Sequence, residues 1–273
     1  MMLPDCQELL LKLEDGVLHI TLNRPHKRNA MNSRLVDEMM AVFTAIENDR
    51  GVRAVVLRGA QGNFCAGGDI SGMNKQEVDE NGQVISAEQA AWNFNRSFGY
   101  MITKVNNAPQ VVICVLEGAV LGGGFGLACI SDIAIADVAA TLAMPETGLG
   151  IIPAQIAPFV VMRAGLTQAR RLALTGERIK GNAAQAMGLV HFITDGEEAL
   201  SAQLAAVITG VKRCAPDANV QTKELMLQVG KHELKSLLDK ASDMFSVALS
   251  GPEGQEGTRA FIEKRKPQWA LTE

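Results

Sequence analysis

The sequence predicts an α/β protein in which a spiral core of strands and helices is followed by a helical C-terminal region. Short β-branched runs alternate with longer amphipathic stretches through most of the chain, and glycine-rich turns follow two of the predicted strands. Beyond Glu197 no strand signal remains. We therefore expect a core over residues 1–198 and a C-terminal helical region over residues 199–273.

The N-terminal part predicts a hairpin followed by a helix. Residues 8–13 and 17–22 alternate toward apolar character around an Asp-Gly pair, which is typical of a tight hairpin turn. Asn32 or Ser33 can cap a helix that runs to about residue 48. The apolar residues of this helix recur at the spacing that covers one helical face: Leu35, Val36, Met39, Met40, Phe43 and Ile46.

The middle of the chain carries the two glycine-rich turns. A strand over residues 54–57 leads into the first turn, residues 59–69. A buried strand over residues 111–116 leads into the second, residues 118–126, whose three consecutive glycines open a short helix. The other predicted segments are a mobile polar loop over 73–84, strands over 132–136 and 188–193, an irregular stretch over 141–153, and helices over 87–105, 168–174, 183–187, 199–212, 218–229, 232–249 and 253–266.

Composition and charge place the chain among soluble globular proteins. Of its 273 residues, 47% are hydrophobic and 21% are charged, and the net charge of −4 argues against nucleic acid as a partner. Five cysteines without metal-ligand spacing and four scattered histidines predict neither a metal site nor a disulfide framework. Residues 111–130 carry a single charge, but their glycines disfavour a membrane span. We see no leader or peroxisomal signal and expect a cytoplasmic protein.

The two glycine-rich turns could supply hydrogen-bond donors to one oxygen. If both preceding strands end at the same edge of a sheet, the backbone amides of Gly68 and Gly123 can converge as an oxyanion hole. The alternative is that both segments are only tight turns. No G-x-G-x-x-G pattern occurs in the second turn, no Walker lysine follows it, and no G-x-S-x-G elbow is present, so Cys65 is expected to be a small buried residue rather than a nucleophile.

Glu146 is the candidate acid/base. It follows Pro145 in an apolar setting, which would raise its proton affinity toward the range that suits a group exchanging protons near neutral pH. The alternative is a helix-capping or surface glutamate.

Five motifs, in order along nearly the whole chain, resemble the crotonase superfamily of enoyl-CoA hydratases and isomerases. They are residues 23–30, residues 64–70, residues 118–126 with Asp132, Pro145-Glu146, and residues 261–266. The resemblance implies a ββα spiral core, here residues 1–198, and a C-terminal helical trimerisation region, here residues 199–273. It also implies a homotrimer or a dimer of trimers.

The resemblance further implies an acyl-CoA thioester as the substrate, so that coenzyme A arrives with the substrate and no separate cofactor or metal is expected. Gly68 and Gly123 match the amides that polarise the thioester carbonyl, and Glu146 matches a catalytic glutamate. The positions that match CoA contacts are Lys27 and Arg28 at the CoA entrance, Ala66, Asp69 and Ile70 along the main chain, and Phe261 and Lys264, which in some members reach the CoA of a neighbouring subunit.

One position departs from the pattern of hydratases that use two glutamates. Gly126 stands where the first of the two would be, so the resemblance implies either a hydratase that holds water differently or a Δ3,Δ2-enoyl-CoA isomerase that uses Glu146 alone. Residues 151–158 resemble the subgroup that acts on glutaconyl-type enoyl-CoAs, in which Gln155 could orient water or a polar group of the substrate; alternatively it is a surface amide. A non-catalytic RNA-binding member is the remaining alternative, which the acidic balance disfavours.

Overall fold

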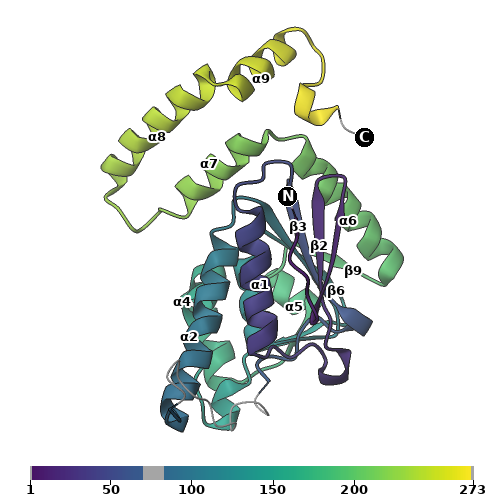
Figure 1. Cartoon of the computed structure of the whole chain (residues 1–273), viewed down its shortest axis with the longest axis vertical. Helices are drawn as coiled ribbons and strands as arrows, with labels where there is room; N and C mark the ends of the chain where they lie inside the picture. Colours follow the sequence, from purple (N-terminus) through teal and green to yellow (C-terminus); the bar gives the residue numbers. More distant parts are fainter. Residues whose placement is uncertain (1, 70–82, 272–273) are drawn as a thin grey trace.

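The computed structural model describes residues 2–69 and 83–271 and confirms an α/β fold with a mixed sheet (Figure 1). The main sheet has six strands in the order β1-β2-β3-β4-β6-β9, in which β1 and β2 are antiparallel and every other pair is parallel. Its strands are β1 (Leu9–Glu14), β2 (Val17–Leu22), β3 (Ala54–Gly59), β4 (Val111–Leu116), β6 (Ile133–Asp137) and β9 (Phe192–Thr194).

The predicted N-terminal hairpin and helix are confirmed. Asp15 and Gly16 both have positive φ (51° and 72°), as a tight hairpin turn requires, and they join β1 to β2. Asn32 caps helix α1 (Ser33–Ile46) by accepting a hydrogen bond from the Leu35 amide at 2.9 Å.

A second sheet, which the sequence did not reveal, lies directly after the central strand. The segment 118–126, expected to be one glycine-rich turn, contains strand β5 (Ala119–Leu121). Strand β5 pairs with β7 (Thr141–Ala143), and β7 pairs with β8 (Ile179–Lys180). Three residues are too few to show the alternation by which a strand is predicted. This sheet brings the turn at residues 122–123 beside residues 65–68.

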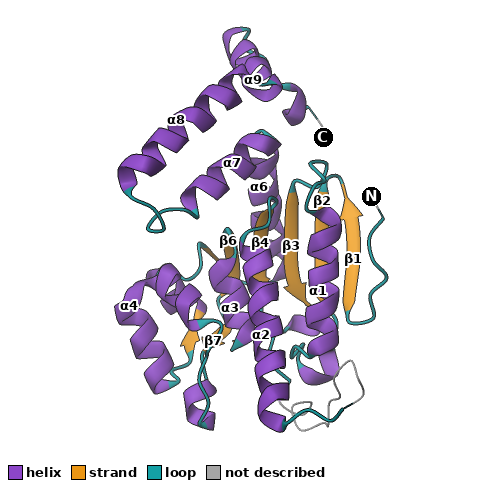
Figure 2. Cartoon of the chain, turned by 60° about the vertical axis from the view of Figure 1, so that its left-hand side comes forward, coloured by secondary structure: helices purple, strands orange, loops and turns teal. Residues whose placement is uncertain are grey.

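Helices cover both faces of the main sheet. Helices α1, α2, α3 and α4 pack on one face and enclose the larger core, and α6 covers the opposite face through Leu200, Val207 and Val211. Figure 2 shows α1, α2 and α3 in front of the strands. The helices not yet delimited are α2 (Ala87–Asn106), α3 (Gly123–Ile130), α4 (Ala157–Thr175), α5 (Gly181–Ala186) and α6 (Glu197–Lys212).

The remaining helices stand apart from the core. Helix α7 (Pro216–Met226) is tied to the sheet by Lys223, whose Nζ lies 2.7 Å from Asp132 Oδ2. Helices α8 (Leu234–Ser250) and α9 (Pro252–Ile262) extend beyond it at the top of Figure 1. The helical character of the C-terminal region is confirmed, although α6 at its start packs on the sheet of the core. Its role in trimerisation stays a prediction, and the predicted loop over 73–84 falls almost wholly outside the described residues.

The loop between β2 and α1 is held by a fully buried asparagine. Asn29 accepts a hydrogen bond from the Arg24 amide at 2.9 Å through Oδ1. Its Nδ2 donates to the carbonyls of Ala60 (2.9 Å) and Asn63 (2.6 Å). The side chain therefore joins this loop to the first glycine-rich turn.

We expect Asn29→Ala to lower the free energy of unfolding by about 2–3 kcal/mol, because one buried and two partly buried backbone groups lose their partner. Urea denaturation followed by circular dichroism measures this loss. Asn93→Ala, at an exposed position of α2, is the control and should change stability by less than about 0.5 kcal/mol. A loss as small as the control's for Asn29→Ala would contradict this account of the loop.

Candidate active site

One cavity of about 150 Å³ brings together segments that are distant in the sequence. Both glycine-rich turns reach it, at Ala66, Gly67 and Gly68 and at Gly122 and Gly123. Its other lining residues come from α1, from the loop before α1, from α2 and from residues 145–156. They are Met31, Val36, Phe94, Asn95, Phe98, Pro145, Glu146, Leu149, Ile151, Ile152, Pro153, Ala154, Gln155 and Ile156. Gly68, Gly123 and Glu146, the catalytic candidates from the sequence, thus line the same cavity, and their roles stay a prediction.

The backbone around Gly68 is paired on one side only. Met31 donates from its amide to Gly67 O at 2.8 Å, and Asp69 donates from its amide to Met31 O at 2.8 Å. Successive peptide groups of an extended segment point to opposite sides, so the amide of Gly68 points away from Met31. No hydrogen bond to this amide occurs within the described residues.

Gly123 offers its amide for a different reason. It is the first residue of α3, and the first amides of a helix have no partner within the helix. The preceding residue, Gly122, has φ 52° and ψ −120°, a conformation essentially restricted to glycine, and its own amide is bonded to Ala143 O at 3.0 Å. The turn therefore fixes the helix start so that the Gly123 amide remains available at the cavity.

Among the described residues that line this cavity, Glu146 is the one with a carboxylate. It begins a short 3-10 helix (Glu146–Leu149), and a Cβ on Gly122 would lie 2.9 Å from its Oε1. Its Oε2 is buried and has no hydrogen-bond partner among the residues that the structure describes. Burial raises the pKa of the Glu146 carboxyl above its ordinary value, although a hydrogen bond from its own backbone acts in the opposite direction. The side chain is thus neither a helix cap nor a freely solvated surface group.

The place for a second carboxylate is filled by apolar side chains. A Cβ on Gly126 would lie 2.3 Å from Ile156 Cγ2 and 3.1 Å from Ile102 Cδ1. A residue larger than glycine therefore does not fit at this position without rearrangement of its neighbours. The departure from the two-glutamate pattern is therefore built into the packing between α3 and residue 156.

Gln155 lies at the cavity wall with its amide engaged on both sides. Its Nε2 donates to Asn95 Oδ1 at 2.8 Å, and its Oε1 accepts from Arg96 Nη1 at 3.3 Å. It is therefore not a free surface amide. Sequence reasoning did not single out Asn95 or Arg96, because a polar residue within a helix gives no signal of the cavity that it faces.

The predicted CoA contacts near the first turn lie beside the cavity. Ala66 lines it and donates from its amide to Arg28 O at 2.9 Å, which places the exposed Lys27 and Arg28 next to the turn. Ile70 lies outside the described residues.

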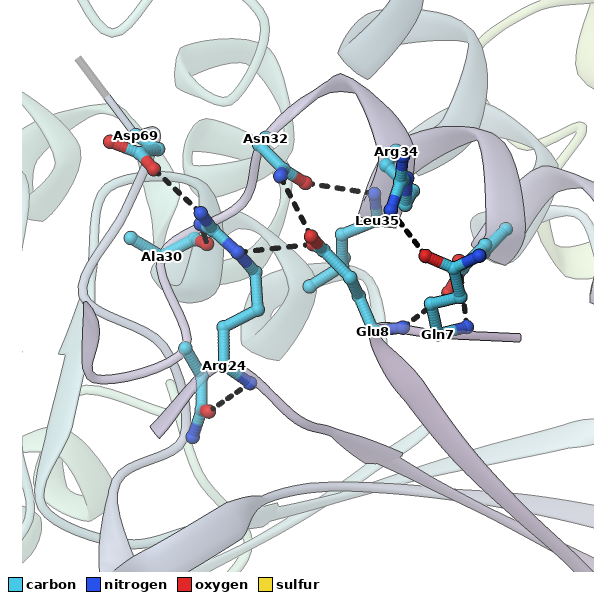
Figure 3. A network of polar contacts seen from close by, with 10 residues as sticks. Gln7, Glu8, Arg24, Ala30, Asn32, Arg34, Leu35 and Asp69 are labelled. Atoms are coloured by element: carbon cyan, nitrogen blue, oxygen red, sulfur yellow. Dashed lines mark hydrogen bonds and ion pairs between the residues drawn. The ribbon is translucent and has the colours of Figure 1, made fainter. Parts of the chain in front are cut away.

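The side chain of Asp69 is held by a buried cation that the sequence did not single out. Arg24 places Nη2 2.8 Å from Asp69 Oδ2 and Nε 3.0 Å from Glu8 Oε2. It also donates to the Ala30 carbonyl, and Asn32 binds the other oxygen of Glu8 at 3.0 Å (Figure 3). All three charged side chains are less than a fifth exposed, so the network fixes the end of the turn against β1 and the start of α1.

Phe261 and Lys264 do not approach the cavity of their own chain. Figures 1 and 2 both place α9 at the opposite end of the molecule from α2, and Phe261 is 85% exposed. Their contact with the CoA of a neighbouring subunit stays a prediction.

The cysteines behave as structural residues where they lie in the core. Cys65, Cys114 and Cys129 are buried, and burial raises the pKa of each thiol to about 12. The prediction that Cys65 is a small buried residue is confirmed, and its raised pKa disfavours the thiolate that a nucleophile requires. Within the described residues no group of three or more metal-ligating side chains occurs, and none of the helices there is long and apolar enough to span a bilayer.

Comparisons with known proteins agree with this architecture. A protein-family model described as "Enoyl-CoA hydratase/isomerase" matches residues 12–271. The chain is 31% identical to "Short-chain-enoyl-CoA hydratase" of Clostridium acetobutylicum, over 96% of this chain and 97% of the relative. It is 29% identical to "1,2-epoxyphenylacetyl-CoA isomerase" of Escherichia coli, over 96% and 97%. Among solved structures, Pseudomonas aeruginosa AtuE shares 51% identity with a TM-score of 0.91, covering 97% of this chain and 100% of that one.

The buried carboxylate predicts a pH-dependent stability. The pKa of Glu146 is higher in the folded than in the unfolded chain, so folding is weakened as pH rises above the unfolded pKa. Glu146→Gln removes this penalty and should increase the free energy of unfolding at pH 7, with the gain vanishing below about pH 4. Urea titrations at several pH values measure it, with the exposed Glu198→Gln as control. A gain that is the same at all pH values would contradict the assignment to burial of the charge.

Proposed function

The chain belongs to the enoyl-CoA hydratase/isomerase family, and from that premise we propose that it is an enoyl-CoA hydratase, a hydro-lyase that adds water across the α,β double bond of an enoyl-CoA thioester. The observation that carries the proposal is the shared cavity of Gly68, Gly123 and Glu146. In this proposal the cavity combines two backbone donors with one acid/base in a largely apolar enclosure.

In this proposal the amides of Gly68 and Gly123 bind the thioester oxygen. Addition of a nucleophile at Cβ moves negative charge onto that oxygen as an enolate, and donors fixed in advance stabilise this charge without having to reorganise. Glu146 takes a proton from the attacking water and returns a proton to Cα. Its raised pKa suits both steps, because a group that must gain and lose a proton works best near the operating pH.

Residues around the first turn would hold the CoA portion of the substrate. The backbone of Ala66, Asp69 and Ile70 would bind the pantetheine and adenine portions, and Lys27 and Arg28, at the CoA entrance, would bind its phosphates. Phe261 and Lys264 would serve the site of a neighbouring subunit in a homotrimer or a dimer of trimers. The exposed apolar side chains of α8 and α9 support such an assembly: Leu234, Leu238, Phe245, Val247, Leu249, Phe261 and Ile262.

Isomerisation is the alternative that a specific observation favours. Ile156 and Ile102 occupy the place of a second carboxylate, and a single acid/base is sufficient to move a proton from C2 to C4 of a 3-enoyl-CoA. The acyl group in either reaction would be branched and of the glutaconyl type, on the resemblance of residues 151–158.

Glu146→Gln should retain acyl-CoA binding but lower kcat by about 100-fold or more, because the amide cannot act as an acid/base. Hydration of 2-enoyl-CoA is followed by the loss of conjugated absorbance, and binding by calorimetry with a saturated acyl-CoA. Glu198→Gln is the matched control and should retain wild-type kcat. Near-wild-type turnover of Glu146→Gln would remove the proposed role of this carboxyl.

The two reactions are separated by mass and by substrate. A hydratase converts 2-enoyl-CoA to a product heavier by one water molecule. An isomerase converts 3-enoyl-CoA to a conjugated product of unchanged mass. We expect the former with a panel that includes 3-substituted glutaconyl-CoAs; conversion of 3-enoyl-CoA alone would favour the alternative.

A further inference from the structure

Three polar side chains form a chain of hydrogen bonds that ends at the wall of the cavity. Arg96 Nη1 donates to Gln155 Oε1 at 3.3 Å, and Gln155 Nε2 donates to Asn95 Oδ1 at 2.8 Å. Asn95 and Gln155 line the cavity, and the chain links helix α2 to residues 151–156 opposite. Its two ends differ in character, a guanidinium at one and a primary amide at the other.

The direction of this chain follows from the chemistry of arginine. A guanidinium can only donate, so the oxygen of Gln155 must face Arg96 and its nitrogen must face Asn95. Asn95 must then present its oxygen to Gln155, which leaves Nδ2 as its outer group. No hydrogen bond from Asn95 Nδ2 occurs within the described residues. The outer group of Asn95, a residue that lines the cavity, is therefore a donor of fixed polarity rather than an amide that is free to flip.

The packing around the chain holds it in place. The Arg96 guanidinium lies 4.0 Å from the centre of the Tyr100 ring, a cation–π contact that orients it. A Cβ on Gly99 would lie 2.0 Å from Gln155 Oε1, so the absence of a side chain at that position allows Gln155 to lie directly on α2. Donors oriented in one direction also polarise one another.

The surroundings of Asn95 make the donor selective. Phe94, Phe98, Leu149 and Ile152 line the same cavity and are apolar. Once a bound molecule displaces water from the Asn95 donor, that donor is satisfied only if the molecule supplies an acceptor. Resting on the proposed function, we propose that Asn95 is a specificity-determining residue for an acyl-CoA whose acyl chain carries an oxygen acceptor beyond the double bond, best a carboxylate, and that Gln155 and Arg96 are positioning residues.

A carboxylate is favoured over a neutral oxygen because of charge. Arg96 lies at the far end of the chain, and each amide turns its oxygen toward Arg96 and its NH2 group, the positive end of its dipole, away from it. A hydrogen bond to an ionised acceptor is roughly twice as strong as one between neutral groups. An unsubstituted hydrocarbon chain would leave Asn95 Nδ2 without a partner.

Paired ligands test the proposal without requiring turnover. Calorimetry on the full chain gives dissociation constants for succinyl-, glutaryl- and adipyl-CoA and for the chain-matched butanoyl-, pentanoyl- and hexanoyl-CoA. We expect at least one carboxylated ligand to bind about 10-fold or more tightly than its alkyl match. Asn95→Leu, which keeps the side-chain size but removes the donor, should reduce this ratio by about 10-fold. Asn93→Leu, at an exposed position on the same helix, should leave the ratio at its wild-type value.

A second variant separates positioning from a merely structural role. Gln155→Glu can still accept from Arg96 but has no donor for Asn95, so the Asn95 amide is expected to turn and present its oxygen to the cavity. The preference for the carboxylated ligand should then be lost or reversed although Asn95 itself is unchanged. A structural role alone would weaken both ligands of a pair equally.

The outcomes distinguish this inference from the proposed function. If neither class of acyl-CoA binds, the proposed function fails. If both classes bind equally well to the wild type, or the ratio is unaffected in both Asn95→Leu and Gln155→Glu, the acyl-CoA assignment stands and the specificity proposal is overturned.

Discussion

Residues 65–69 are hydrogen-bonded along two edges, and the cavity depends on this double pairing. On one edge Cys65 pairs with Val120 of β5, and on the other Gly68 pairs with Met31. The segment thus acts as a short strand between two parts of the chain that are far apart in sequence. With the Arg24 network fixing its end, it sets where the Gly68 amide lies relative to Gly123. An oxygen bound by these two amides would then lie at a fixed position relative to Glu146.

Much of the fold could be predicted from the sequence, because its longer elements have a clear hydrophobic period. The hairpin, α1, α2 and the central parallel strands all follow from alternation, caps and glycine punctuation. Strand β5 could not be predicted, since three residues give no period, and yet it aligns the two turns. Within α1, Val42 also belongs to the buried face, seven residues after Leu35, whereas Met40, which was expected on that face, is only partly buried.

The candidate site was predictable where the backbone geometry requires a particular residue type. This holds for the glycines at 68, 122 and 123 and for the Pro145-Glu146 pair. Arg24 and Asn95 do not: one is a buried cation whose partners come from three segments, and the other is a polar residue in a helix whose cavity is formed by a loop some sixty positions later. The position of Gly126 was visible in the sequence, but the reason for it, contact with Ile156, required the structure.

Burial of the Cys65 thiol has a practical consequence. Its side chain has no exposed surface and its pKa is raised to about 12, so a thiol reagent cannot modify it while residues 65–69 remain paired. Modification would require those residues to separate from β5. The rate at which the native Cys65 thiol is labelled therefore measures how often the segment that carries Gly68 opens locally, without any introduced probe.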